Sequence, residues 1–170
     1  MTNTNYKTIA SKIKFEGRAF INGKYVDAID GEKFETINPA TGETLCSVAK
    51  CNSKDVDLAV KVSRKAFNSG VWSRTSPEFR KDVLLKFAEL LRTHGVEKSV
   101  LECIDTGKLI GDCINEVAND APMHFQWYGE LIDKVFGKVG PTEPSLTSLI
   151  VKEPIGIVAG VVPWNFPLMM

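Results

Sequence analysis

The sequence has neither an excess of charge of one sign nor a long uninterrupted apolar run. Its 21 basic and 21 acidic side chains give a formal net charge of zero, whereas binding along a nucleic-acid backbone requires an excess of Lys and Arg. The most apolar stretch, residues 155–170, is broken by two prolines and by Asn165, so it does not resemble a membrane span. We therefore expect no nucleic-acid partner and no membrane partner.

Cysteine and histidine are few and are not spaced as metal ligands. The four cysteines (Cys46, Cys51, Cys103 and Cys113) form no Cys-x-x-Cys pair and have no neighbouring histidine. A disulfide framework or a zinc site is therefore not expected. The first 20 residues are rich in Thr, Asn and Lys and lack the apolar stretch of a secretory signal, so we expect a cytoplasmic location.

The N-terminal part predicts short antiparallel hairpins. Residues 1–18 are expected to form a mobile or loosely attached arm. Asn22-Gly23 supplies the two positive-φ positions of a type I′ turn and predicts a hairpin over residues 20–26. Residues 33–37 and 44–49 are expected to be strands on either side of a turn-rich link.

Helical patterns dominate the middle of the chain. Ser53 is expected to cap a first helix that ends before Gly70, and Ser76 with Pro77 to begin a second that ends at Gly95. A third helix is expected over residues 97–106. A fourth helical region, residues 110–134, is expected to kink or restart at Pro122.

Strand patterns return towards the C-terminus. Residues 137–144 form a Gly- and Pro-rich break, and residues 146–153 and 157–162 are expected to be strands. Because residues 157–162 are continuously apolar, the second strand is expected to be buried on both faces. Strands, then helices, then a buried strand indicate an α/β or α+β domain.

Five motifs follow one another in an order that resembles the NAD(P)-dependent aldehyde dehydrogenase superfamily, from about Phe20 onward. They are Phe20-Ile21-Asn22-Gly23, residues 38–43, Asp105-Thr106-Gly107-Lys108, Glu153-Pro154-Ile155-Gly156 and Pro163-Trp164-Asn165-Phe166-Pro167. The resemblance implies the N-terminal part of an aldehyde-dehydrogenase-like α/β fold, truncated just after the last motif. Its incomplete Rossmann-like cofactor domain would comprise hairpins and helices in residues 19–136. Residues 154–170 would add a first buried strand and an active-site turn, and residues 137–153 would form an oligomerisation hairpin.

The resemblance also assigns site residues. Asn165 would donate its side-chain amide to the oxyanion formed during aldehyde oxidation, and Val162, Pro163, Trp164 and Asn165 would contact NAD or NADP. The alternative roles are an asparagine that caps a turn and apolar residues that pack in the core. Asp105, together with backbone carbonyls near Ile37, would hold Na⁺ or K⁺, or else Asp105 is a helix-terminal charge without a role.

The same resemblance implies the reaction of a full-length parent, the oxidation of an aldehyde to a carboxylic acid with NAD(P). Residues 124–129 resemble those of members that act on amino- or γ-glutamyl-aldehydes. No cysteine lies where the family places its nucleophile, and no general-base glutamate segment is present, so this chain alone is expected to be inactive. The parent would be a homo-oligomer assembled through residues 137–153. The alternatives are a non-catalytic truncated subunit that binds full-length partners and a fragment without function.

Overall fold

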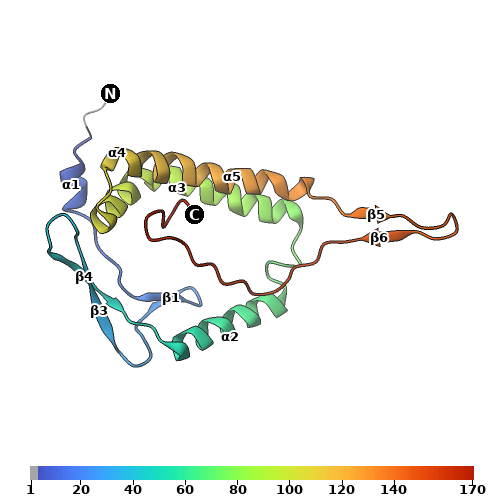
Figure 1. The fold of residues 1–170 in the computed structure, drawn as a ribbon, viewed down its shortest axis with the longest axis horizontal. Helices are drawn as coiled ribbons and strands as arrows, with labels where there is room; N and C mark the ends of the chain where they lie inside the picture. Colours follow the sequence, from blue (N-terminus) through green and yellow to red (C-terminus); the bar gives the residue numbers. More distant parts are fainter. Residues whose placement is uncertain (1–3) are drawn as a thin grey trace.

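The structure, a computed structural model, describes residues 4–170. Helices α3 (Pro77–Thr106) and α5 (Ala121–Leu131) lie side by side in one layer, and helix α2 (Ser53–Ser69) and two small hairpins lie opposite them (Figure 1). A third hairpin, formed by β5 (Lys138–Gly140) and β6 (Ser148–Ile150), projects away from this body. Helix α1 (Tyr6–Ala10) begins at the cap Asn5 and contacts α3. Part of the expected arm over residues 1–18 thus forms a short helix without buried residues, and residues 1–3 lie outside the described part.

The two predicted N-terminal hairpins are confirmed. Strands β1 (Ala19–Ile21) and β2 (Lys24–Val26) pair antiparallel. They are joined by Asn22 and Gly23 with φ of 55° and 73°, as a type I′ turn requires. Strands β3 (Lys33–Ile37) and β4 (Thr44–Ala49) also pair antiparallel, with a shift of register between Thr36 and Ile37.

Helix α2 (Ser53–Ser69) begins one residue earlier than expected, because its cap is Asn52 and not Ser53. The Asn52 side chain accepts from the Lys54 amide, and Asp55 accepts from the Asn52 amide at 2.9 Å, which completes a capping box. Asp55 is buried and also accepts from the Ile29 amide at 2.9 Å. This carboxylate therefore joins the start of α2 to the segment that precedes β3.

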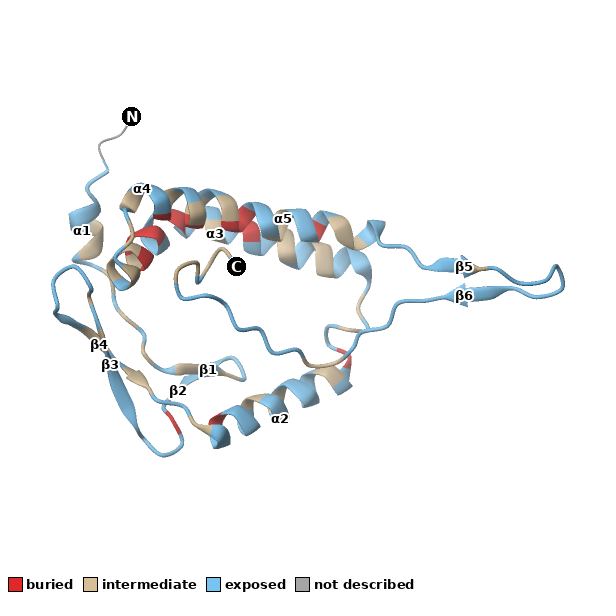
Figure 2. Cartoon of the chain, viewed as in Figure 1, coloured by how far each residue is buried: buried red, intermediate tan, exposed pale blue. Residues whose placement is uncertain are grey.

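Helix α3 (Pro77–Thr106) begins at the predicted cap Ser76 but passes through Gly95 without a break. The predicted end at Gly95 and the separate third helix are therefore wrong. A Cβ atom at Gly95 would lie 2.7 Å from the Cβ of Ala118, so the glycine lets a second helical segment approach the α3 backbone closely. The buried residues of the helical layer lie mainly where α3 faces this segment and α5 (Figure 2).

The region expected to kink or restart at Pro122 does not restart there, because it stays helical and changes from π- to α-helix at Ala121. Helix α4 (Ile110–Cys113) continues into the π-helix η1 (Ile114–Asp120), then α5 (Ala121–Leu131) and the 3₁₀ turn η2 (Ile132–Lys134). Pro122 is the second residue of α5 and follows directly on helical residues, so its missing N–H leaves this helical region one hydrogen bond short. The wider π turn carries Val117, which is buried, and η1 packs against α3.

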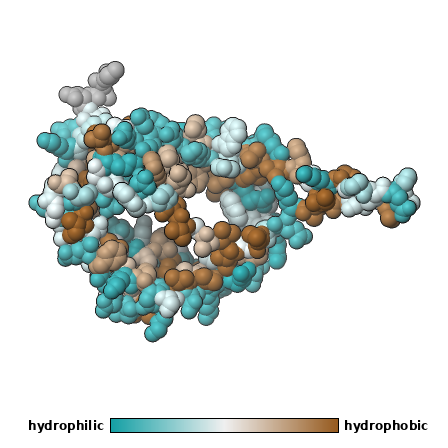
Figure 3. Space-filling view, viewed as in Figure 1, coloured by the Kyte–Doolittle hydropathy of each residue, from teal (hydrophilic) through white to brown (hydrophobic). Residues whose placement is uncertain are grey.

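The C-terminal part differs most from expectation. Strands β5 (Lys138–Gly140) and β6 (Ser148–Ile150) form the projecting hairpin, but the strand predicted over residues 157–162 is absent. That segment is extended and unpaired, and Val161 is 97% exposed. A strand buried on both faces needs neighbouring strands and covering helices, and no described strand pairs with residues 157–162. Apolar side chains of the hairpin and of the middle of the molecule are exposed in Figure 3.

Between residues 4 and 170, no helix is both long and apolar enough to cross a membrane.

Candidate functional site

The 163–167 turn lies at the end of the long extended segment that returns from the hairpin to α3 (Figure 1). The amide of Phe166 donates to the carbonyl of Pro163 at 3.3 Å, and the amide of Met170 donates to the carbonyl of Phe166 at 3.3 Å. Pro163 and Pro167 restrict φ at both ends of the motif. The motif therefore forms a compact turn although the segment before it has no strand partner.

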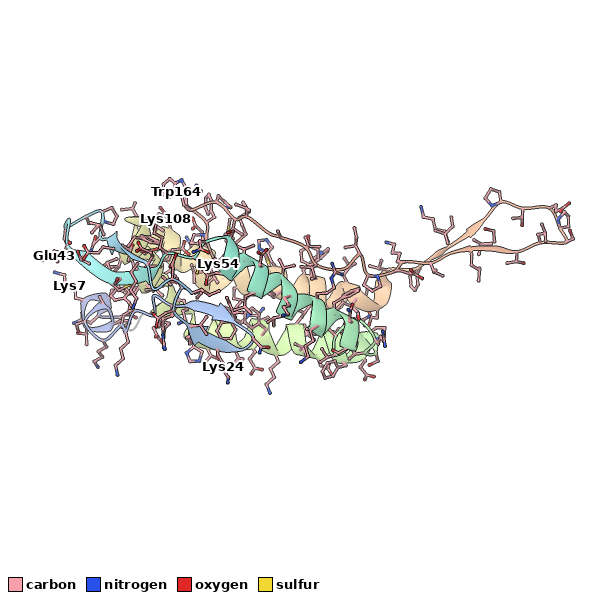
Figure 4. The ribbon with its side chains drawn as sticks, turned by 90° about the horizontal axis from the view of Figure 1, so that it is seen from below. Lys7, Lys24, Glu43, Lys54, Lys108 and Trp164 are labelled. Carbon is pink, nitrogen blue, oxygen red and sulfur yellow. The ribbon has the colours of Figure 1, made fainter. Side chains whose placement is uncertain are left out.

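The turn is attached to the helical layer through Lys108. The Lys108 Nζ atom donates to the backbone carbonyl of Asn165 at 3.0 Å and lies 4.4 Å from the centroid of the Phe166 ring. It also forms ion pairs with Glu102, at 3.3 Å, and with Glu116. We call these four contacts the Lys108 anchor. Figure 4 shows Lys108 and Trp164 at the same end of the molecule.

The end of helix α3 places the Lys108 side chain. Gly107, with φ of 75°, ends the helix in the left-handed conformation. The Cys103 thiol then donates to the Lys108 carbonyl at 3.0 Å. Glu102 lies on α3 and Glu116 on η1, and the side chain of Glu102 is only 6% exposed. A carboxylate this buried is costly without a partner, so the ion pairs fix the ammonium between the two helices.

Lys108 belongs to the Asp105-Thr106-Gly107-Lys108 motif, but no role for its side chain follows from the sequence. Its partners are 57 residues away at Asn165 and 8 residues away at Glu116. No local pattern connects the turn to this lysine. The only signal was the presence of both motifs in one chain.

The structure places the predicted cofactor-binding residues in one exposed stretch. Val162 is about half exposed, Trp164 is about three-quarters exposed, and Pro163 is exposed as well. Asn165, whose carbonyl accepts from Lys108, is half-buried. In the described chain, Val162 and Trp164 are therefore not core residues. The sequence contains no Gly-rich turn for a cofactor pyrophosphate.

Asp105 contacts strand β3 at Thr36, the residue before Ile37 in the predicted cation site. The Thr36 hydroxyl donates to Asp105 Oδ1 at 3.1 Å, which joins the last turn of α3 to strand β3. A register shift between Thr36 and Ile37 interrupts the β3–β4 ladder beside this contact. A carboxylate, a hydroxyl and carbonyls are the hard oxygen donors that suit an alkali cation.

The four cysteines are free thiols whose environments oppose ionisation. Burial raises the pKa of Cys113 to about 11 and raises the pKa values of Cys46, Cys51 and Cys103 as well. These thiols are therefore protonated near neutral pH and are poor nucleophiles. Among residues 4–170, no group of three or more His, Cys, Asp and Glu side chains is arranged to hold a metal ion.

Known sequences match almost the whole chain. A profile of the Aldehyde dehydrogenase family matches residues 25–170. Aminoacetaldehyde dehydrogenase of Pseudomonas aeruginosa is 41% identical over 170 residues, which is 100% of this chain and 34% of that protein. The NADP/NAD-dependent aldehyde dehydrogenase PuuC of Escherichia coli is 42% identical over 161 residues, 95% of this chain and 32% of that protein.

Solved structures give the same match in three dimensions. Indole-3-acetaldehyde dehydrogenase AldA of P. syringae, solved in complex with NAD⁺, superimposes with a TM-score of 0.94 at 42% identity over 97% of this chain and 33% of that chain. The γ-glutamyl-γ-aminobutyraldehyde dehydrogenase of Burkholderia cenocepacia superimposes with a TM-score of 0.93 at 44% identity, over 96% and 33%. The chain thus spans about a third of the length of the relatives it matches. On its sequence and its fold, it belongs to the aldehyde dehydrogenase family.

Proposed function

We propose that this chain is the N-terminal part of an NAD(P)-dependent enzyme that oxidises an aldehyde to a carboxylic acid. The observation that carries the proposal is the 163–167 turn, held on the helical layer by the Lys108 anchor. Relatives that match the chain across this turn are named as aldehyde dehydrogenases, and one is solved with NAD⁺. The division into an N-terminal arm, a cofactor-binding part, a hairpin and a final turn belongs to the same proposal.

Asn165 is the residue to which we assign a catalytic role. When a nucleophile adds to an aldehyde, the carbonyl oxygen becomes an oxyanion, and a neutral amide held at a fixed position stabilises that charge. The loss of such a donor costs about 3 kcal/mol in enzymes generally. Because the Asn165 backbone is fixed by Lys108 at 3.0 Å, its side chain starts from a constrained position.

Val162, Pro163 and Trp164 are proposed to form one wall of the cofactor pocket. They lie in sequence immediately before Asn165 and are exposed to about half or more, so they can contact a ribose or a nicotinamide. Bound NAD or NADP supplies the hydride acceptor for the oxidation. The wall orients that ring and limits the access of water to it.

The nucleophile and the general base are proposed to lie outside this chain. All four cysteines have raised pKa values and are therefore poor nucleophiles. The chain also lacks the glutamate segment that would supply a general base. We therefore expect the 170-residue chain alone to produce no aldehyde-dependent NADH. Clear turnover of a small aldehyde by the purified chain would contradict this part of the proposal.

The proposed substrates are amino-aldehydes or γ-glutamyl-aldehydes. Two proteins similar to this chain are named for aminoacetaldehyde and for γ-glutamyl-γ-aminobutyraldehyde. The residues 124–129 that suggested this class lie on α5. A comparison of kcat/KM for aminoacetaldehyde and for an uncharged aldehyde of the same length would test the assignment.

The β5–β6 hairpin is proposed to assemble a cytoplasmic homo-oligomer. It projects from the body, and both of its strands have an unpaired edge in the described chain (Figure 1). Val139, Leu149 and Ile150 on it are exposed apolar side chains. A strand edge with apolar neighbours is suited to adding to a sheet of another subunit.

The Na⁺ or K⁺ site at Asp105 and Ile37 is proposed as well.

A second candidate function is a non-catalytic subunit that binds full-length partners. The exposed apolar side chains of the hairpin and of Val158 and Val161 favour this reading, because a large apolar surface marks a contact site or a tendency to aggregate. A fragment without function is the third possibility. A non-catalytic subunit should purify as a defined species, whereas a non-functional fragment should aggregate.

The deciding experiment is the intact mass of the native protein in its source cells, detected with an antibody raised against residues 55–74. A species much heavier than 18.8 kDa, with aldehyde-dependent NADH production, would support the proposal. A single species near that mass without activity would contradict it and would favour the non-catalytic subunit.

A further inference from the structure

We propose that Lys108 is a positioning residue for Asn165: it sets the orientation of the oxyanion donor by holding the two consecutive residues at the centre of the 163–167 turn. The inference deepens the proposed function and rests on it. It comes from the contact of the Lys108 Nζ atom with the Asn165 carbonyl, at 3.0 Å, and with the Phe166 ring, at 4.4 Å.

The hydrogen-bonding capacity of the ammonium group is used completely. A lysine ammonium has three N–H donors, and the structure provides three acceptors: Glu102 Oε1, Glu116 Oε2 and the Asn165 carbonyl oxygen. The side chain is 18% exposed. No N–H remains to approach a substrate, so Lys108 acts on the reaction through Asn165.

The packed helices α3 and η1 hold the 163–167 turn in place through Lys108. Glu102 belongs to α3 and Glu116 to η1, two elements that pack against each other. The two carboxylates therefore hold the Lys108 ammonium in place, and the ammonium holds the 163–167 turn. Hydrogen bonds to charged groups are stronger than those between neutral groups, so this link can hold a turn whose preceding segment has no strand partner.

Two adjacent attachment points determine orientation as well as position. The hydrogen bond at the Asn165 carbonyl fixes the plane of the peptide that follows, and the cation–π contact fixes the next side chain. Together they restrict rotation of the Asn165 Cα–Cβ bond vector relative to α3. Misplacement of a catalytic group by about 1 Å can cost about 100-fold in rate.

The test is a double-mutant cycle in the full-length enzyme that contains this chain. Lys108→Met removes the ammonium and keeps the apolar stem, Asn165→Ala removes the proposed donor, and the double variant combines them. The first-turnover rate of NADH formation and the Kd of NAD are measured for each. Lys108→Met should lower the first-turnover rate roughly 10- to 100-fold, leave the Kd of NAD little changed, and cause no further loss in the Asn165→Ala background.

Lys81→Met is the matched control, because Lys81 pairs with Asp133 at 2.9 Å and touches no residue of the turn. It should retain the wild-type first-turnover rate. If Lys108→Met fails to fold, Lys108→Arg keeps the charge opposite both glutamates but presents donors in a planar fork. It should give a smaller loss of rate that also disappears in the Asn165→Ala background.

The outcomes separate the inference from the proposed function. An Asn165→Ala variant with an unchanged rate would overturn the oxyanion assignment and, with it, the role of Lys108. A slow Asn165→Ala variant combined with an unaffected Lys108→Met variant would overturn only the positioning role. Equal losses from Lys108→Met in both backgrounds would likewise refute it, since Lys108 would then act independently of Asn165.

Discussion

Gly95→Ala tests the close contact between α3 and η1. The added Cβ atom would lie 2.7 Å from the Ala118 Cβ atom and 2.9 Å from its Cα atom, whereas carbon atoms in contact are separated by about 3.5–4.0 Å. The shortfall is thus about 1 Å. Because one of the opposing atoms is backbone, a change of rotamer cannot relieve the overlap, and η1 must move away from α3.

Two opposing effects determine the change in stability. Replacing a glycine within a helix by alanine stabilises the helix by about 1 kcal/mol. Overpacking in a well-packed core costs about 1–3 kcal/mol. We therefore expect Gly95→Ala to be less stable than the wild-type protein by up to about 2 kcal/mol. The displacement should also weaken the Lys108 anchor, because Glu116 lies on η1.

Gly111→Ala is the matched control, since Gly111 lies in α4 and a Cβ atom there would have no neighbour within 4 Å. It should be neutral or stabilising. Urea unfolding followed by circular dichroism at 222 nm measures both variants under identical conditions. The double variant Gly95→Ala/Ala118→Gly should recover part of the loss by removing one of the two opposing atoms. Equal stability of Gly95→Ala and Gly111→Ala would refute the close-contact explanation.

Three further predictions address the cap of α2, the thiols and acid stability. Asp55→Ala should destabilise the protein by about 1–3 kcal/mol in urea unfolding, because two backbone amides lose their acceptor. Iodoacetamide followed by mass spectrometry should modify exposed Cys51 first and buried Cys113 only on unfolding, and early labelling of Cys113 would contradict its burial. Hydrogen bonds from Lys134 and Lys81 lower the pKa of Asp133 from 3.8 to about 2. The ionised Asp133 carboxylate should therefore contribute fully to folding stability above its pKa in the unfolded chain, and this contribution should be lost as the pH falls through about 2. The difference in Tm between wild type and Asp133→Asn should accordingly be present at pH 7 and vanish near pH 2, and a difference that persists there would argue against the pairing.

Elements with local signals were predicted well. The Asn22-Gly23 turn and the Ser76-Pro77 helix start depend on backbone conformations that neighbouring residues determine, and both are observed. The cap of α2 was misplaced by one residue because Asn52 and Ser53 are both good caps, and the capping box with Asp55 decides between them.

Elements that depend on distant partners were predicted poorly. Gly95 was interpreted as a helix end because glycine is a poor helix former, but its contact with Ala118 in η1 requires a small residue inside a continuous helix. Residues 157–162 have the composition of a buried strand, yet a strand also needs neighbours, and none of the described strands pairs with them. Composition indicates a tendency to be buried and does not supply the partner.

The candidate site shows the same division. The motif around Asn165 could be identified from consecutive residues, whereas the hydrogen bond between Thr36 of β3 and Asp105 joins residues 69 positions apart. The Lys108 anchor could not be predicted, since it joins residues 57 positions apart through a side chain whose local sequence indicates only the end of a helix.

The separation between Lys108 and Asn165 has a consequence for how the chain is made. Glu102, Lys108 and Glu116 lie within one short stretch, whereas the Asn165 carbonyl follows Lys108 by 57 residues. At about 5–20 residues per second, a ribosome adds Asn165 roughly 3–11 seconds after Lys108, and helices form within microseconds. The ion pairs of Lys108 with Glu102 and Glu116 can thus form on the nascent chain before the 163–167 turn has been synthesised. The 163–167 turn then folds as it binds to a Lys108 side chain that its two glutamates already hold in place.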